Sequence, residues 1–194
     1  MSAVIEPTLR VHQSGIAGAG PGLWYGADAP DGDAGAWAEA PVGSRYYRKM
    51  GDGGIWYQKV STKLLDGSWR PVSGAITQTV TYDQFTDGTA AVGTKTMAYQ
   101  IPIGATVKRA FVQALTGFTG NSSCALTVGD GSTADRYNTG TPSIYTTAAG
   151  ETDLGAVSGT AYHTAAVTVT LTATAGSDWT AVAAGAMTVV IVIG

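Results

Sequence analysis

Residues 165–174 read AAVTVTLTAT, and this stretch decides the fold class. From Ala165 onward every second residue is apolar, while the residues between them become an unbroken series of threonines. Because successive side chains of a β-strand point to opposite faces, this alternation predicts an antiparallel strand with one buried side. The predicted buried face holds Ala165, Val167, Val169, Leu171 and Ala173, and the opposite face holds Ala166, Thr168, Thr170, Thr172 and Thr174.

Short stretches of similar character recur at regular spacing on the N-terminal side of this strand and once after it. The further predicted strands are residues 76–82, 94–100, 106–114, 124–128, a weak one at 143–147, and 187–193. No window carries the 3.6-residue period of a long helix. The chain is therefore predicted to be all-β, with an antiparallel β-sandwich of jelly-roll or Greek-key type over residues 75–194.

The last predicted strand is apolar on both faces. Met187, Val189, Ile191 and Ile193 share one face, and Val190 and Val192 lie on the other. A strand with no polar face must be covered on both sides, so we predict that it lies in the middle of a sheet or at a subunit interface.

Residues 41–73 differ from the sandwich region in having longer turns and larger side chains. Three β-rich runs, SRYYRK, IWYQKVS and SWRPV, are separated by the turn sequences MGDGG and TKLLDG. This arrangement predicts a small three-stranded meander. Four of the five tryptophans precede residue 74, which indicates that aromatic side chains supply much of the core of this unit.

Residues 1–40 have turn and linker composition with no sustained period, so we predict an extended N-terminal arm. A segment of this kind gains order by lying along a partner, where spaced apolar side chains enter pockets. The apolar candidates for partner binding are Val4, Ile5, Leu9, Ile16, Leu23 and Trp24.

Composition limits the classes of partner. Only 13% of the residues are charged, against about 25% in typical soluble domains, so much of the surface is expected to meet another chain. A net charge of −3 provides no general attraction to nucleic acid. The first residues contain Glu6, Pro7 and Arg10 where an export signal needs an apolar core, and no apolar run reaches the length of a membrane span. We therefore expect a protein made in the cytoplasm, with no membrane partner.

The region from residue 45 to residue 70 interleaves aromatic residues with six basic and two acidic ones. The basic residues are Arg45, Arg48, Lys49, Lys59, Lys63 and Arg70. One interpretation is a surface that stacks single-stranded nucleic acid or sugar. The interpretation we favour is that the aromatic side chains form the core of the meander and the basic ones alternate outward. Arg45, Arg48 and Lys49 are then candidates for contact with a partner.

Residues with catalytic chemistry are few. Cys124 and His163 form a conceivable nucleophile and base, but no orienting third residue is indicated, and the alternation in CALTV predicts a buried structural cysteine. His12 lies in the arm. Calcium ligation by Asp130 and Asp135, or by Asp28, Asp31 and Asp33, competes with ordinary turn formation, which we favour. The sequence predicts neither an enzyme nor a bound metal or cofactor.

Two parts of the chain resemble bacteriophage structural proteins. Residues 40–72 contain Pro41, Gly43-Ser44, a strand ending in charged residues, a glycine-rich turn, the run WYQKV and then Trp69. This pattern resembles a small connector module found near the attachment point in tailed-phage virion proteins, from which it departs in a third basic residue and in the long turn TKLLDG. The runs IPIGATVKRAFVQALTGFTG (101–120), LTVGDGSTADRYNTG (126–140), TAAVTVTLTAT (164–174) and AGAMTVVIVIG (184–194) are similar in layout to the C-terminal sandwiches of head-fibre, decoration or cement proteins.

The resemblance implies a virion surface protein, commonly a trimer, and brings no catalytic residue. It leads us to expect a capsid decoration or head-fibre subunit that binds the major capsid protein or another virion protein through its N-terminal region. The alternative is a tail-fibre or adhesin subunit that recognises a host surface glycan.

Overall fold

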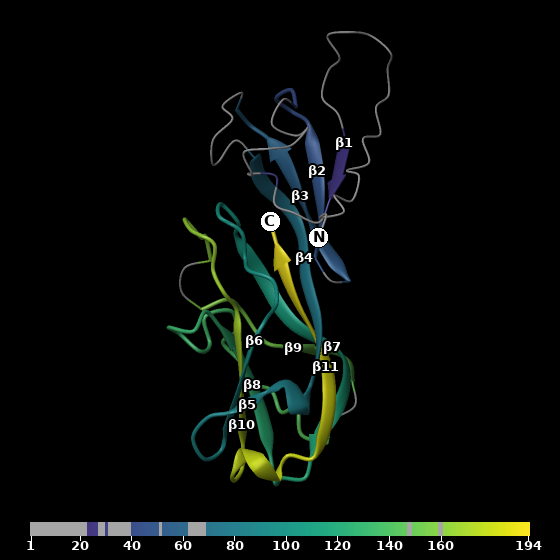
Figure 1. Ribbon diagram of the computed structural model, residues 1–194. Coiled ribbons are helices and arrows are strands. Elements are labelled where there is room, and N and C mark those ends of the chain that lie inside the picture. The colour runs from purple at the N-terminus through teal and green to yellow at the C-terminus, as the bar shows by residue number, and fades with distance from the viewer. Residues whose placement is uncertain are drawn as a thin grey trace, which may run out of the picture.

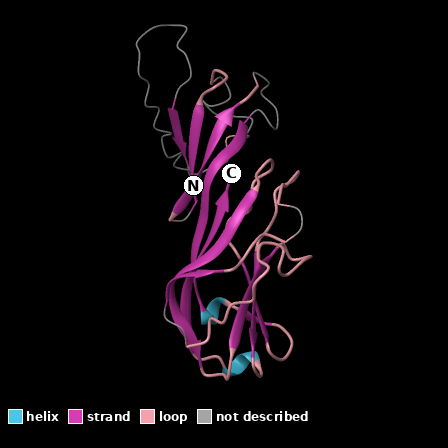
Figure 2. Ribbon diagram, turned by 180° about the vertical axis from the view of Figure 1, so that it is seen from behind, coloured by secondary structure: helices cyan, strands magenta, loops and turns pink. Residues whose placement is uncertain are grey.

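The computed structural model describes residues 23–26, 30, 40–50, 52–61, 69–146, 149–158 and 161–194. These residues confirm the all-β prediction. The strands are β1 (Leu23–Gly26), β2 (Arg45–Met50), β3 (Gly53–Lys59), β4 (Trp69–Thr81), β5 (Thr86–Asp87), β6 (Val92–Thr96), β7 (Val107–Thr119), β8 (Cys124–Gly129), β9 (Ala149–Asp153), β10 (Thr170–Ala175) and β11 (Ala184–Ile193). Two short 3₁₀ helices, η1 (Tyr82–Gln84) and η2 (Trp179–Ala181), both belong to the sandwich (Figure 2).

The strands form two sheets. One sheet has the order β1-β2-β3-β4-β11-β7-β9 and the other has the order β5-β6-β10-β8. The four-stranded sheet packs against the β4-β11-β7-β9 part of the larger sheet, while β1, β2, β3 and the start of β4 extend beyond it (Figure 1). The molecule is therefore elongated, with a two-layer sandwich at one end and a single-layer meander at the other.

The sandwich has jelly-roll connectivity. From β4 to β8 the chain passes repeatedly between the two sheets, and it does so again from β9 to β11. The weak strand predicted at 143–147 is present only as isolated bridges, from Ser143 to Ala125 and from Tyr145 to Phe118. Neighbours within a sheet therefore lie far apart in sequence, as in the pairing of Ile191 with Ile76.

The long strand β4 joins the two parts. Its first half pairs with β3 and its second half pairs with β11, so the chain crosses residue 74 without leaving the sheet. Gly74 has a φ of +146°, and a Cβ there would lie 2.2 Å from the carbonyl oxygen of Gly54, so only glycine fits. The meander predicted for residues 41–73 is thus one continuous sheet with the sandwich.

Strand limits differ from the prediction where hydrogen bonding is irregular. In the stretch 165–174, the strand begins only at Thr170, and Val167 forms an isolated bridge with Ile101. Val169, Leu171 and Ala173 are buried as predicted, but Ala165 is exposed because the chain there belongs to a loop. The predicted strand 94–100 ends at Thr96. The strands β1, β5 and β9 were not predicted, because they are short and lack clear alternation.

Candidate functional site

The aromatic residues of the meander divide between its two faces. Tyr46 pairs with Tyr57, and Tyr47 pairs with Trp56, in the β2–β3 ladder. Tyr46, Tyr57 and Trp69 are buried, and the Tyr46 ring lies 6.4 Å from that of Tyr57 and 6.0 Å from that of Trp69. The interpretation of the aromatics as core is therefore confirmed for these three residues.

The opposite face of the meander carries three half-buried rings, which we call the aromatic face: Tyr25, Tyr47 and Trp56. They come from the adjacent strands β1, β2 and β3. The Tyr47 and Trp56 ring centres are 4.9 Å apart, and Tyr25 lies 6.2 and 6.1 Å from them. Gly54 makes room for this packing, because a Cβ there would lie 2.4 Å from the Tyr47 ring. The sequence did not predict Tyr25 as a member of this face, because nothing in LWYG indicates a strand partner.

The three basic candidates of β2 do not share one surface. Arg45 and Lys49 are exposed and alternate with Tyr47, so they flank the aromatic face. Arg48 points to the other side, where it is half-buried and lines a hollow beside residues 98–103. The candidates therefore contribute to two different surfaces.

Lys59 corrects the expectation that basic residues of the meander point outward. Its side chain is buried, and its Nζ lies 5.5 Å from the centre of the Trp69 ring. The two-residue period of β3 places Lys59 on the same side as Ile55 and Tyr57, both buried. A cation over an aromatic face is an electrostatically favourable way to bury such a group.

The arm candidates are only partly described. Leu23 is half-buried on β1, which pairs in parallel with β2, and Trp24 lies in the same strand. Val4, Ile5, Leu9 and Ile16 lie outside the described residues, as do His12, Asp28, Asp31 and Asp33. Within the predicted arm, residues 23–26 thus form the edge strand of the large sheet.

Large apolar side chains that remain exposed are concentrated at the meander end. Among the described residues they are Val42, Val60, Val72, Ile103 and Tyr162. Val42 and Val60 flank the backbone hydrogen bond from Gly43 to Lys59, and Val72 lies on β4. Ile103 and Tyr162 lie in sandwich loops that border a hollow with Trp69 and Arg70. Three of these five side chains therefore belong to the meander, and the other two lie where the sandwich meets it.

The terminal strand lies mid-sheet, as predicted, between β4 and β7. Met187, Val189, Ile191 and Ile193 are buried in the core of the chain itself. On the outer face Val190 is buried and Val192 is half-buried. A subunit interface on this strand stays a prediction. Such an interface would use the outer face of the strand, because the inner face packs in the core of the chain itself.

Cys124 is a structural residue of β8. It is buried, and burial raises the pKa of its thiol to about 11, so it is held as a neutral thiol. The ring of His163 meets the Tyr137 hydroxyl instead, with Nε2 3.2 Å from Oη. The nucleophile and base pair considered from the sequence is therefore not assembled by these contacts.

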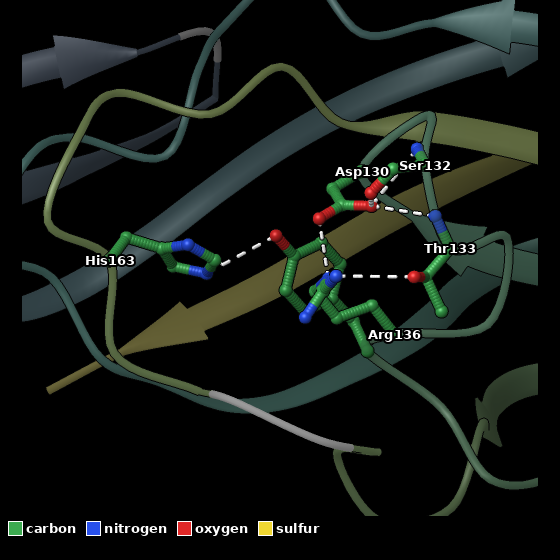
Figure 3. A network of polar contacts seen from close by, with 6 residues as sticks. Asp130, Ser132, Thr133, Arg136 and His163 are labelled. Atoms are coloured by element: carbon green, nitrogen blue, oxygen red, sulfur yellow. Dashed lines mark hydrogen bonds and ion pairs between the residues drawn. The ribbon is translucent and has the colours of Figure 1, made fainter.

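Asp130 organises the loop between β8 and the bridge at Ser143 (Figure 3). Its Oδ1 accepts hydrogen bonds from the Ser132 amide at 3.1 Å, the Ser132 hydroxyl at 2.8 Å and the Thr133 amide at 2.8 Å. Its Oδ2 pairs with Arg136 Nε. Burial raises the pKa of Asp130, but these hydrogen bonds and the Arg136 charge outweigh it, so the pKa lies below its ordinary value. Asp130 thus forms a turn of the kind that the sequence predicts, through hydrogen bonds to residues two and three positions ahead.

The same loop is tied to the interior of the sandwich. Asn138 is buried, and its side-chain oxygen accepts a hydrogen bond from the Val128 amide at 2.7 Å. Tyr137 is also buried, and burial raises the pKa of its hydroxyl to about 12. His163 is buried beside it, and burial, reinforced by the Arg136 charge, lowers the pKa of the imidazole. The folded chain thus favours a neutral His163.

This preference predicts a pH dependence of stability. A lowered pKa in the folded state means that the unfolded chain takes up the proton first, at its ordinary pKa near 6.5, so the free energy of unfolding should fall as the pH drops below 6.5. In His163→Gln this decline should become shallower in urea unfolding curves measured between pH 7.5 and 5. Asp178→Asn is the control, because Asp178 is not among the charges that act on His163 and its own contribution is lost only below about its ordinary value of 3.8. Equal slopes for the parent and His163→Gln would contradict the expectation.

No group of three or more His, Cys, Asp or Glu side chains with metal-binding geometry occurs in the part of the chain that the structure describes. None of the helices in that part is long and apolar enough to cross a membrane. No family model, curated protein or solved structure matches the chain.

Proposed function

We propose that this chain is a structural virion protein, a trimeric capsid decoration or head-fibre subunit that attaches to the particle through its N-terminal end. The observation that carries the proposal is the position of the exposed apolar and aromatic side chains. The aromatic face, Arg45, Lys49 and the exposed valines Val42, Val60 and Val72 all lie on the meander. Apolar anchors ringed by polar and charged groups are typical of protein interfaces.

The geometry of the large sheet supports the same orientation. Because β4 runs from the meander into the sandwich, a meander held at a particle would carry the sandwich away from its surface (Figure 1). The basic residues beside the aromatic face suit an acidic partner surface. The sandwich residues considered for catalysis or metal binding have structural roles. Asp130 forms a turn, Cys124 is buried in the core, and His163 contacts the Tyr137 hydroxyl.

A test is the binding of the purified protein to particles that lack it. Trp56→Ala should reduce binding by about tenfold or more, as expected when a central aromatic anchor is truncated, while lowering stability by only about 1–2 kcal/mol because Trp56 is half-buried. Tyr82→Ala is the matched control, since Tyr82 is a half-buried aromatic of the sandwich. Equal binding by both variants would place attachment elsewhere.

The charge contribution is tested with the same assay. The double variant Arg45→Gln and Lys49→Gln should bind particles more weakly than the parent at low salt. At high salt, where charges are screened, the two proteins should bind with similar affinity.

The tail-fibre or adhesin alternative is distinguished by copy number. Gel densitometry of purified virions should find many copies per particle for a decoration protein and few for a tail tip.

A further inference from the structure

Two hollows lie side by side where the meander meets the sandwich. The larger has a volume of about 370 Å³ and the smaller of about 160 Å³. Ile103, which is 38% exposed, borders both of them. The larger hollow alone lies within the range of small-ligand sites, about 300–1,000 Å³. We call the two neighbouring hollows together the junction groove.

The groove combines apolar surface with polar side chains, and the charged ones among them are all basic. Its lining includes Arg48 and Tyr99 in the larger hollow and Arg70 and Tyr162 in the smaller, with Gln100 and Thr164. Two guanidinium groups are therefore present among the lining residues, and no carboxylate is. Arg70 Nη1 donates a hydrogen bond to Tyr162 Oη at 3.3 Å, which aligns these two side chains across the smaller hollow.

The loops that carry the groove are held by backbone hydrogen bonds. The Gly104 amide donates to the His163 carbonyl at 2.8 Å, and the His163 amide donates to the Ala105 carbonyl at 2.9 Å. Gly104 has a φ of +78°, which closes the turn after Ile103. His163, which lies between Tyr162 and Thr164 in the sequence, also contacts the Tyr137 hydroxyl through its side chain. The groove is thus formed by ordered backbone and needs little rearrangement to bind a ligand.

We propose that the junction groove binds an acidic saccharide, a short glycan that carries a sugar carboxylate. Arginine recognises a carboxylate through paired N–H donors, and aromatic and isoleucine side chains pack against the apolar faces of sugar rings while tyrosine, glutamine and threonine reach the hydroxyls. A protein partner buries about 800 Å² on each side, more than a narrow groove of this size presents. A nucleic acid needs a run of phosphate contacts, whereas this groove has two cations.

The test uses saturation-transfer difference NMR on the full chain with two probes of equal length. One is the hyaluronan tetrasaccharide, which carries glucuronate, and the other is the neutral tetramer of N-acetylglucosamine. We expect a saturable signal for the acidic probe and at least fivefold weaker binding of the neutral one. Arg70→Gln should weaken binding of the acidic probe about fivefold or more, because Arg70 is exposed and its replacement leaves the fold intact.

Arg45→Gln is the matched control, since it removes an exposed arginine of the meander that lies outside the groove. Its binding should equal that of the parent, and thermal melting should show that both variants are folded. The proposal is overturned if neither probe binds, if both bind equally, or if Arg70→Gln has no effect. Tighter binding of a tetraglutamate peptide than of the acidic sugar would assign the groove to an acidic peptide instead. None of these outcomes depends on attachment to particles.

Discussion

Replacing Val190 with aspartate is expected to lower the free energy of unfolding by about 4 kcal/mol. Val190 is 6% exposed at the centre of β11, between Thr77 of β4 and Phe111 of β7. A carboxylate there would lose its hydration. The nearby guanidinium of Arg109 already pairs with Glu151 at 2.7 Å and stacks on the Phe111 ring at 4.6 Å, so it offers the new charge little compensation.

Thr188→Asp is the matched control for this prediction. Thr188 lies two residues earlier on the same strand and the same face, but it is half-buried, and its hydroxyl is 2.9 Å from that of Thr79. Its replacement should cost about 1 kcal/mol, mostly through the lost hydrogen bond. Urea unfolding monitored by tryptophan fluorescence compares the two. If Val190→Asp is no less stable than Thr188→Asp, the outer face of β11 is accessible to water and the sheet arrangement around it is wrong.

Deleting residues 1–40 is expected to abolish binding to particles that lack the protein, while the remaining chain stays folded. The deletion removes β1, which leaves the edge of β2 open and takes Tyr25 away from Tyr47 and Trp56. The strands β2 to β4 remain anchored because β4 continues into the sandwich. Because the deletion removes an apolar anchor, the loss of binding should be the same at all salt concentrations. The weaker binding caused by removing Arg45 and Lys49 should instead depend on salt.

Light scattering and a shorter deletion complete this experiment. The full chain is expected to form a trimer of about three times 19.7 kDa, and the truncated chain should keep the same subunit number. A deletion of residues 1–22 retains β1 and separates the contribution of that strand from the contribution of the preceding segment. Undiminished decoration by the chain that lacks residues 1–40 would reverse the proposed orientation.

The properties that depend on local periodicity were determined by the sequence itself. Alternation at Val169, Leu171 and Ala173 predicted which side of β10 is buried, and the doubly apolar pattern of residues 187–193 predicted a central strand. Both follow from the two-residue repeat of a strand, which needs no knowledge of its partners. The turn at Asp130 was equally local, since its carboxylate bonds amides two and three residues ahead.

The pairing of strands was decided only in the tertiary structure. The β11 strand joins β4 and β7 across long stretches of chain. The strand β9, with the sequence AGETD, is defined by its pairing with β7, to which the salt bridge between Glu151 and Arg109 adds. The burial of Lys59 required the Trp69 ring at a particular place, and the junction groove gathers residues from β2, β4 and two distant loops. Periodicity specifies the inner side of a strand, but its neighbours depend on the total surface that a whole arrangement buries, which no short segment encodes.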